Sequence, residues 1–339
     1  MKKIVFLTAL FCTLYACKRD DIAAPFKFDN PEISLKIPEG FPTLNNAIEN
    51  NKPTKYGVQL GEKLFHDTRL SANNTVSCAS CHKQGNAFAD NNIQALGIEG
   101  RVGLRNVPPI QNMAFMKFYN WDGAKLALEN QVLVPIITHE EMNSSILEVV
   151  DKIKNDSEYK VLFKKAFGDD AVKQERIYRS IAQYEYTLIS ANSKYDRVKL
   201  KGEQFTESEA RGYQAFKVKC ESCHSTELFT DQSFRNVGFP LNPSTEEAGR
   251  ARVSGAEADF MRFRVPSLRN AEYTAPYGSF GQFATLMDVL DYFDKSVLDA
   301  DNLDPILKQN GNRIPLSAQE KQDIISFIKT LSDKDFVGR

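Results

Sequence analysis

The sequence predicts a mainly α-helical protein that consists of two halves of similar organisation. Apolar residues recur with helical spacing in four segments, which cover residues 56–65, 174–191, 207–216 and 317–331. Patterns typical of β-strands are few along the rest of the chain. With 339 residues, the chain is long enough for two domains that each bury a core.

Two of these segments share a local motif, and the other two close the halves. GEKLF at residues 61–65 ends the first segment, and GYQAF at residues 212–216 ends the third. Ser317 and Glu320 have the spacing of a capping box, which predicts the start of the last helix. The second and fourth segments carry apolar stripes at helical intervals, formed by Ile177, Ile181, Tyr184 and Leu188 and by Ile324, Ile325, Ile328 and Leu331.

The composition narrows the class of protein. Hydrophobic residues make up 42% of the chain and charged residues 26%, which is typical of a soluble globular protein and excludes a disordered, collagen-like or coiled-coil chain. Beyond the first sixteen residues, no apolar run approaches the ~20 residues needed to cross a bilayer. The formal net charge of −1 gives no electrostatic case for nucleic acid, so no nucleic-acid partner is expected.

The first sixteen residues have the pattern of an export signal. Two lysines at positions 2 and 3 precede an apolar stretch that is too short to span a membrane, and LYAC at residues 14–17 resembles a bacterial lipobox. We therefore expect a lipoprotein signal peptide at residues 1–16, a lipid anchor to a membrane on Cys17, and a tether with an irregular arm at residues 17–44. A plain secretory signal is the alternative, and both place the mature chain in the periplasm of the cell envelope.

Four of the six cysteines form two CxxC pairs, and a histidine follows each pair directly. Two thiols three positions apart can bond to the two vinyl groups of one haem, and the adjacent histidine can then ligate its iron. A redox dithiol or half of a zinc site is the alternative for a single CxxC. Two copies in a chain with only four histidines favour two covalently bound haem c groups. The attachment residues are Cys78, Cys81 and His82 in one motif and Cys220, Cys223 and His224 in the other.

Each haem-attachment motif lies after one of the predicted helices, as in a small cytochrome c. We therefore expect two cytochrome c-like domains, at residues 45–198 and 199–339, each with one covalently bound c-type haem. The two haems are expected near the contact between these domains.

With these residues identified, the chain from about residue 56 to the C-terminus resembles the bacterial di-haem cytochrome c peroxidase family, which includes the MauG-like enzymes. The resemblance rests on the order of seven segments, LGEKLFHDTRLSANNTVSCASCH, GRVGLRNVPPIQN, NWDGAKLALENQVLVPI, HEEM, SANSKYDR, CESCH and FRVPSLRNAEYTAPYGSFGQFATL. It implies that the N-terminal haem is the peroxidatic one and that electrons enter through the C-terminal haem.

The resemblance also implies catalytic roles for three residues. Trp121 matches the tryptophan that the family places between the two haems, where it can relay an electron. Gln131 and Glu141 match the polar pair over the open face of the peroxidatic iron. Glu141 would move a proton between the two oxygens of bound peroxide, and Gln131 would orient peroxide or water.

A calcium ion is a further expectation from the resemblance. Asn106, Thr274 and Pro276 match the family's calcium site between the domains. Ca²⁺ prefers oxygen ligands, which here would be a side-chain amide and two backbone carbonyls. The ion would tie together the two domains that the electron must cross.

The sequence departs from the family at the peroxidatic haem. Ile98 stands sixteen residues after the first proximal histidine, where many members have a histidine that caps the iron. Isoleucine cannot ligate iron, so we expect this haem to be five-coordinate or to hold only water, and to need no reductive activation. Of the two remaining histidines, we expect His66 to pack against its neighbours and His139 to be solvated.

A second departure concerns the electron-entry haem. Phe293 stands at the position of its sixth ligand, which is methionine or tyrosine in the family. Tyr292 and Met287 are the available substitutes, and a vacant position is the third alternative. Methionine would raise the reduction potential of this haem, whereas tyrosinate would lower it.

These expectations lead to one main function and two alternatives. The main prediction is reduction of hydrogen peroxide to water, with electrons from an external donor such as a small cytochrome c or a cupredoxin. The first alternative is MauG-like oxidation of a protein or organic substrate, and the second is a non-catalytic di-haem cytochrome for electron transfer or sensing. The sequence leaves open whether the chain forms a homodimer.

Overall fold

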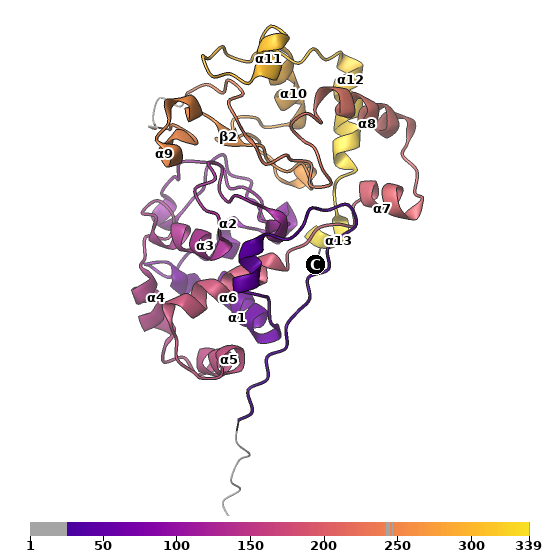
Figure 1. The fold of residues 1–339 in the computed structure, drawn as a ribbon. Helices are drawn as coiled ribbons and strands as arrows, with labels where there is room; N and C mark the ends of the chain where they lie inside the picture. Colours follow the sequence, from indigo (N-terminus) through magenta and orange to yellow (C-terminus); the bar gives the residue numbers. More distant parts are fainter. Residues whose placement is uncertain (1–25, 242–244, 246, 339) are drawn as a thin grey trace, which may run out of the picture.

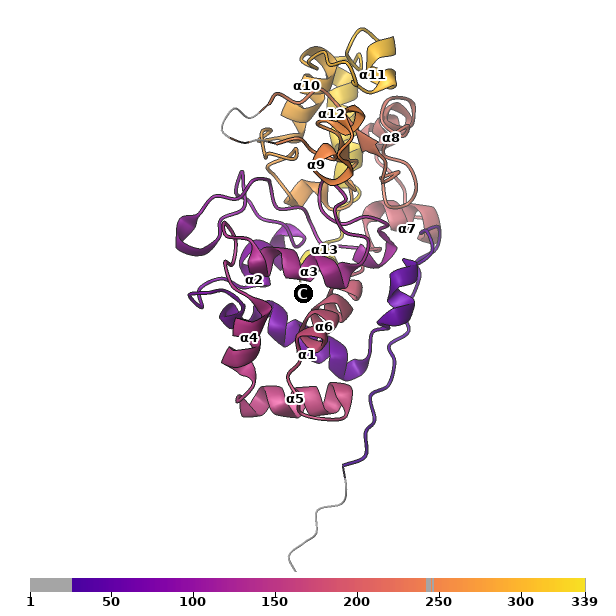
Figure 2. The same cartoon turned by 60° about the vertical axis from the view of Figure 1, so that its left-hand side comes forward.

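The computed structural model describes residues 26–241, 245 and 247–338, and helices dominate this part of the chain. The helices of the first half form one group and those of the second half form another above it, except that α13 lies with the first group (Figures 1 and 2). No helix among the described residues is long and apolar enough to cross a membrane. The α-helices are α1 (Lys55–His66), α2 (Cys78–Cys81), α3 (Leu128–Ile137), α4 (Ile146–Ile153), α5 (Ser157–Phe167), α6 (Gln174–Tyr186), α7 (Lys194–Lys201), α8 (Glu207–Lys219), α9 (Ala251–Ser254), α10 (Leu286–Lys295), α11 (Pro305–Gln309), α12 (Ala318–Lys329) and α13 (Lys334–Val337). The short 3-10 helices are η1 (Asn46–Asn50), η2 (Thr68–Leu70), η3 (Gln84–Asn86), η4 (Ile98–Gly100), η5 (Met113–Phe115), η6 (Glu257–Asp259) and η7 (Ala271–Tyr273).

In the first half, α1 and α6 cross at a glycine. A Cβ atom on Gly61 would lie 1.9 Å from the backbone carbonyl oxygen of Ser180, so only glycine allows this approach. Because the two backbones come so close, the apolar faces of both helices are removed from water. The fully buried residues at this crossing include Leu60, Leu64, Ile177 and Ile181.

The second half repeats this arrangement with α8 and α12. A Cβ atom on Gly212 would lie 1.8 Å from the backbone carbonyl oxygen of Asp323. The rings of Phe216 and Phe327, both buried, pack with their centroids 5.1 Å apart. The glycines of GEKLF and GYQAF therefore allow the same close approach of two helices in each half, which explains why the sequence repeats this motif.

Three of the four predicted helices have bounds close to those expected, but the second is shorter. The expected helix at residues 174–191 ends at Tyr186. Beyond it, the backbone N–H of Ser190 donates to the Asn112 side chain at 2.9 Å, and the backbone N–H of Asn112 donates to the Leu188 carbonyl at 2.8 Å. These tertiary hydrogen bonds replace helical ones, so the chain leaves the helix early. The capping box of α12 is present as predicted, because Ser317 caps Glu320 and the Glu320 carboxylate accepts from the Ser317 N–H at 2.8 Å.

The few strand patterns correspond to one small sheet among the described residues. β1 (Phe234–Arg235) pairs antiparallel with β2 (Phe263–Arg264), with Phe234 opposite Arg264. The backbone N–H of Arg264 also donates to the carbonyl oxygen of Trp121, at 2.8 Å. The sheet of the second half is therefore fixed to the backbone of the first half.

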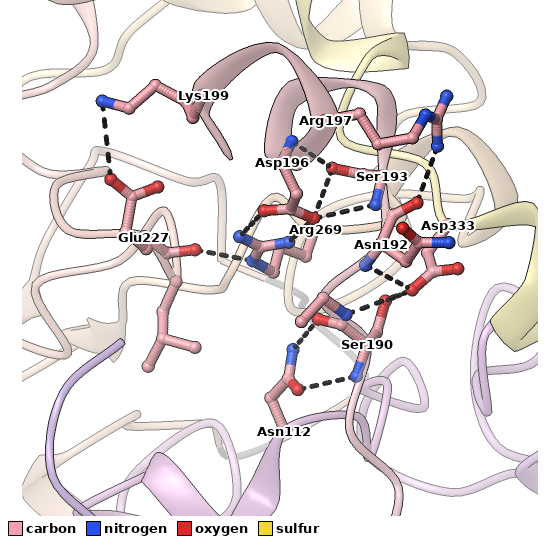
Figure 3. Close-up of polar contacts among 12 residues, drawn as sticks. Asn112, Ser190, Asn192, Ser193, Asp196, Arg197, Lys199, Glu227, Arg269 and Asp333 are labelled. Atoms are coloured by element: carbon pink, nitrogen blue, oxygen red, sulfur yellow. Dashed lines mark hydrogen bonds and ion pairs between the residues drawn. The ribbon is translucent and has the colours of Figure 1, made fainter. Parts of the chain in front are cut away.

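A buried polar network joins the two halves (Figure 3). Arg269, which is fully buried, donates to the two carboxylate oxygens of Asp196 at 2.9 and 2.8 Å. Asp333 accepts a hydrogen bond from the Ser190 hydroxyl at 3.1 Å, and the backbone of Ser190 is bonded to Asn112. A buried charge pair tolerates little displacement because an unpaired charge in the interior is costly. The network therefore fixes the segment between α6 and α7 against the end of the chain.

Both ends of the described chain cross from one half to the other. In the N-terminal arm, Phe41 packs edge-on against Phe115 at 5.2 Å and lies 4.6 Å from the Arg269 guanidinium. At the other end, Phe336 of α13 packs against Phe88, with ring centroids 5.4 Å apart. The expected signal peptide at residues 1–16 and the expected lipid-bearing Cys17 lie outside the described residues.

Candidate functional site

A cavity of about 740 Å³ lies mainly in the first half of the chain. This volume is in the range of sites that bind small molecules and cofactors. Three residues of the second half, Thr245, Arg252 and Arg264, complete its wall. The cavity brings together the first CxxCH motif and the three residues expected to be catalytic, so its lining includes Cys78, Cys81, His82, Trp121, Gln131 and Glu141.

His82 is held in the orientation of an iron ligand. Its Nδ1 lies 2.8 Å from the Phe88 carbonyl oxygen, and only an N–H at Nδ1 can make this hydrogen bond. The lone pair of Nε2 is then free for a metal, which is the usual arrangement of a ligating histidine with a backbone partner. The ring is buried, which lowers the pKa of His82 and favours its neutral, ligating form.

The cysteines of the first motif are half-buried and not joined in a disulfide. Burial raises the pKa of Cys81 to about 11 and that of Cys78 further. Redox-active CxxC motifs have depressed thiol pKa values, so these thiols lack that signature. Two thiols beside a cavity, with a histidine at its wall, fit the attachment of one haem c.

The second motif has the same local geometry. The Nδ1 of His224 lies 3.1 Å from the Phe229 carbonyl oxygen, as His82 does from Phe88. Phe88 and Phe229 both adopt positive φ angles, of 60° and 54°. This strained backbone turns each carbonyl toward its histidine, and its occurrence at both motifs indicates one shared function. Burial raises the pKa of the Cys220 thiol to about 12.

Glu141 provides a titratable group in the cavity wall. It lies in the loop after α3, and its backbone carbonyl accepts a hydrogen bond from the Ile98 N–H at 2.8 Å. Burial raises the pKa of Glu141 to about 6, and the neighbouring charge of Glu140 contributes. A carboxyl group with a pKa near the working pH can both accept and return a proton, which is the requirement for acid–base catalysis.

Gln131 lines the same cavity as Glu141. It stands on the first turn of α3, half-buried, and its Nε2 donates to the Asn120 side-chain oxygen at 3.3 Å. One side-chain oxygen and one N–H of Gln131 remain for a ligand. A helix-surface glutamine would instead face solvent.

Ile98 is buried, with 2% of its surface exposed, and stands at the start of η4. It is not among the described residues that line the cavity, whereas its neighbours Leu96 and Gly97 are. A Cβ atom on Gly97 would lie 2.1 Å from the Glu140 carbonyl oxygen, so the loop is packed tightly on the Glu140–Glu141 backbone. Of the described residues, His82 is the one histidine that lines the cavity.

Trp121 connects the cavity to the second half of the chain. Its indole N–H donates to the Asn106 carbonyl oxygen at 2.9 Å. Its ring belongs to a buried cluster whose other members, Met261, Phe263 and Phe280, come from the second half. A tryptophan packed between the halves can lie on a path between the two motifs.

The expected calcium ligands lie close to one shared loop. Asn106 is buried, and its Nδ2 donates to the carbonyl oxygens of Asn92 and Ile93 at 3.0 and 3.2 Å. Its side-chain oxygen is therefore the atom left for a cation. Asn91 in the same loop donates to the carbonyl oxygen of Ala275, which lies between Thr274 and Pro276 in the chain, at 3.3 Å.

The side chains available as a sixth ligand for the second haem differ in their contacts. Tyr292 is buried, and its hydroxyl donates to the carbonyl oxygens of Val237 and Gly238 at 3.0 and 2.6 Å. Burial raises the pKa of Tyr292 to about 12. Ligation by Tyr292 would require these two hydrogen bonds to break and the phenol to lose its proton. Met287 is half-buried near the start of α10, and Phe293 packs against Tyr292 at 5.5 Å.

Comparisons with known proteins agree with this geometry. The family model described as di-haem cytochrome c peroxidase matches residues 55–205. The methylamine utilization protein MauG of Methylophilus methylotrophus is 32% identical over 309 residues, which cover 89% of this chain and 88% of that protein. The chain belongs to the di-haem cytochrome c peroxidase family. It is accordingly an oxidoreductase of the cytochrome c peroxidase type.

Two further relatives of this peroxidase family extend the comparison. Cytochrome c551 peroxidase of Nitrosomonas europaea is 34% identical over 281 residues, covering 81% of this chain and 79% of that protein. A crystal structure of a MauG-like protein associated with microbial copper homeostasis has a TM-score of 0.82 at 29% identity. It covers 90% of this chain and 97% of that one. The family's defining di-haem character fits the two CxxCH motifs described above.

The remaining histidines of this peroxidase-family chain are not among the described residues that line the cavity. His66 is exposed, its Nδ1 lies 2.9 Å from the Glu62 carbonyl oxygen, and its ring packs against Phe65 at 5.3 Å. The side chain of His139 is 65% exposed and pairs with Glu140 at 3.4 Å. His139 is solvated as expected, whereas His66, which was expected to pack, is exposed and keeps only edge contacts to Phe65 and Tyr184.

Two residues of the cavity were missed in the sequence. Glu185 on α6 lines the cavity and is 5% exposed, and its Oε2 has no hydrogen-bond partner among the described residues. Burial raises the pKa of Glu185 to about 8. A signal was present, because Glu185 follows Ile177 and Ile181 at helical intervals and so places a carboxyl group on the apolar face. Arg264 is the second; it lies in the family-like segment FRVPSLRN, but nothing in that segment marks it as a cavity residue.

Proposed function

We propose that this chain reduces hydrogen peroxide to water with electrons from an external donor and that it needs no reductive activation. The observation that carries the proposal is the cavity itself, in which the first CxxCH motif shares a wall with Gln131 and Glu141 and no second histidine lines the described part. The balanced reaction consumes one peroxide, two electrons and two protons and yields two water molecules. A haem bound at the first motif would supply the iron that binds peroxide and accepts its oxidising equivalents.

The chain's own residues supply positioning and proton transfer. Glu141, with a pKa of about 6, is mostly ionised at neutral pH and can take a proton from the peroxide oxygen nearer the iron. Returning that proton to the far oxygen allows it to leave as water. Gln131, held by Asn120, can orient peroxide through its free amide groups. His82 would hold the iron through Nε2.

The experiment adds equimolar hydrogen peroxide to the purified, fully ferric protein and follows the haem absorbance. A rapid spectral change with one peroxide consumed per protein supports an open site. Continuous peroxide loss with a reduced small cytochrome c or cupredoxin then establishes peroxidase turnover. A ferric spectrum that is wholly low-spin, together with no reaction before or after half-reduction, would instead support the electron-transfer or sensing cytochrome.

MauG-like oxidation of a protein or organic substrate is the second candidate. The observation in its favour is the similarity to MauG proteins over 89% of the chain. Against a direct copy of that chemistry, Phe293 stands at the ligand position and the Tyr292 hydroxyl is bonded to two carbonyls. A protein that reacts with peroxide but turns over no reduced donor would favour this candidate.

The two halves fit two cytochrome c-like domains, at residues 45–198 and 199–339, each with one haem c. Support comes from the repeated helix crossings at Gly61 and Gly212 and from the repeated histidine–carbonyl contacts at the two motifs. The second haem would pass electrons through Trp121, whose ring packs on side chains of the second half. We also propose that Ca²⁺ binds Asn106, Thr274 and Pro276 and stabilises this contact.

For the location of the protein we propose the periplasm, with a lipid anchor on Cys17. The support is the export pattern of residues 1–16 and the lipobox-like residues before the cysteine. Mass spectrometry of the mature N-terminus tests it. A diacylated or triacylated Cys17 is expected, and an unmodified chain that begins after a plain signal cleavage would contradict the anchor.

A further inference from the structure

Arg264 is a buried cation in the wall of the cavity. It stands in β2, with 7% of its surface exposed, and lines the cavity together with Trp121. Its guanidinium makes only long contacts to backbone carbonyls: Nε lies 3.4 Å from the Asn120 oxygen and Nη1 lies 3.5 Å from the Val265 oxygen. Both exceed the usual 2.7–3.2 Å range of an N–H···O hydrogen bond.

The guanidinium has no carboxylate partner among the residues that the structure describes. Burial lowers the pKa of Arg264 to about 10, which still leaves the side chain charged at neutral pH. Arg105, which lines the same cavity, has two carboxylate partners by contrast. It binds Asp122 at 2.7 Å and Glu247 at 2.7 Å.

An unpaired charge in a protein interior is costly, so it is found with a partner anion. The cavity that Arg264 lines also contains the first haem-attachment motif, and a haem c brings two propionate carboxylates. We propose that Arg264 binds a propionate of the haem attached at Cys78 and Cys81. The proposal rests on the proposed attachment of haem at this motif.

The backbone around Arg264 links this contact to both motifs. The N–H of Arg264 donates to the carbonyl oxygen of Trp121 at 2.8 Å. The carbonyl oxygen of the next residue, Val265, accepts a hydrogen bond from the Thr230 hydroxyl at 2.6 Å, in the loop that follows the second motif. One extended segment therefore touches the tryptophan, the cavity and the loop after the second motif. A propionate bound by Arg264 is held against the element that also fixes the position of Trp121.

This makes Arg264 a positioning residue that also sets the reduction potential of the first haem. A nearby positive charge stabilises the ferrous state, which carries one charge less than the ferric state. Removing that charge, while the propionate stays ionised, makes reduction harder. The effect is large only because Arg264 is buried, since an exposed charge is screened by solvent and salt.

The test compares three variants of the holoprotein by spectroelectrochemical titration. Haem content by pyridine haemochrome comes first, because loss of both haems from wild type would refute the proposed attachment rather than the role of Arg264. Arg264→Gln is expected to lower one midpoint potential by at least 59 mV, which is a tenfold change in a one-electron equilibrium. Arg264→Lys, which keeps the charge, is expected to shift it by less than half as much. Lys334→Gln removes an exposed charge outside the cavity lining and is expected to leave both potentials within about 10 mV of wild type.

Three outcomes would overturn the inference. The first is a haem-loaded Arg264→Gln protein whose potentials both match wild type. The second is an equal shift in Lys334→Gln, which would show a general charge effect. The third is a saturable shift of the wild-type potential on adding acetate, which would show that a soluble carboxylate occupies the site. If Arg264→Gln does not load haem, Arg264→Lys still decides, because a shift as large as 59 mV with the charge retained contradicts the proposal.

Discussion

Replacement of Glu141 by glutamine should slow the reaction with peroxide and abolish the fall in its rate at acidic pH. The pKa of Glu141 is about 6, raised by burial and by the charge of Glu140. About nine-tenths of the side chain is then ionised at pH 7 and about one-tenth at pH 5. If the carboxylate takes the first proton, the wild-type rate should fall about tenfold between these pH values. An ordinary glutamate with a pKa of about 4.3 would lose only about one-fifth of its rate.

The assay is stopped-flow absorbance of the ferric protein mixed with peroxide, in single turnover, from pH 4.5 to 8. Glu141→Gln should be slower by about 10²–10⁴ at pH 7, the usual contribution of a general acid–base group. Its residual rate should show no inflection near pH 6. The haem content and the ferric spectrum of the variant should match wild type, because Gln and Glu have nearly the same size.

Glu140→Gln is the matched control for this experiment. Glu140 also lines the cavity, but its side chain is 51% exposed and no step of the proposed reaction uses it. This variant should keep the wild-type rate at pH 7, while its inflection should move to lower pH because a repelling charge is gone. The reasoning fails if Glu141→Gln reacts at more than one-tenth of the wild-type rate, or if the wild-type inflection lies near pH 4.5.

Three further predictions concern stability. Gly61→Ala should lower the free energy of unfolding by about 1–3 kcal/mol in urea titrations, because its Cβ meets a backbone oxygen, whereas Gly85→Ala, whose Cβ meets nothing within 4 Å, should change it little. Glu185→Gln should be as stable as wild type at pH 4 and more stable than wild type by a few kcal/mol at pH 9. The reason is that the buried carboxyl of wild type ionises as the pH rises from 4.5 through 8, which lowers the free energy of unfolding by about 1.4 kcal/mol per pKa unit. Chelation with EGTA should lower the melting temperature of wild type, and added Ca²⁺ but not Mg²⁺ should restore it; Asn106→Ala should melt at the lower temperature with or without Ca²⁺. If Asn106→Ala and calcium-loaded wild type had the same melting temperature, the calcium proposal would be refuted. If the stability of Glu185→Gln and of wild type depended on pH in the same way, the carboxyl of Glu185 would not have a raised pKa in the folded protein.

The sequence predicted the helical architecture because local patterns control it. Apolar spacing located α1, α8 and α12, and the Ser317 capping box located the start of α12. The end of α6 could not be predicted, because the hydrogen bonds that terminate the helix come from Asn112, far away in the chain. Helix ends that depend on tertiary partners leave no local signal.

The same distinction applies to the candidate site. The CxxCH motifs are local, so their residues were found directly. Glu141, Gln131 and Trp121 were found only through the order of family-like segments, and the structure then placed them in one cavity. Arg264 was not found, because its importance depends on what it lacks, namely a carboxylate within reach. A missing partner is a property of the folded molecule and has no counterpart in the sequence.

The two halves share a scaffold but differ where a cavity is needed. An isolated bridge between Tyr119 and Lys125 precedes α3, and a bridge between Tyr277 and Phe283 precedes α10 in the same relation. By this correspondence, the position of Gln131 in the first half is that of an apolar valine in the second, and Pro135 corresponds to a phenylalanine. Aromatic rings pack around α10, and they include Phe239, Phe283, Tyr292 and Phe293.

Polar side chains beside an open cavity suit a site where peroxide must enter and protons must move. Apolar packing suits a haem that only exchanges electrons, because a dry surrounding leaves little solvent to reorganise when the charge changes. This contrast supports the proposed direction of electron flow, from the second motif to the first.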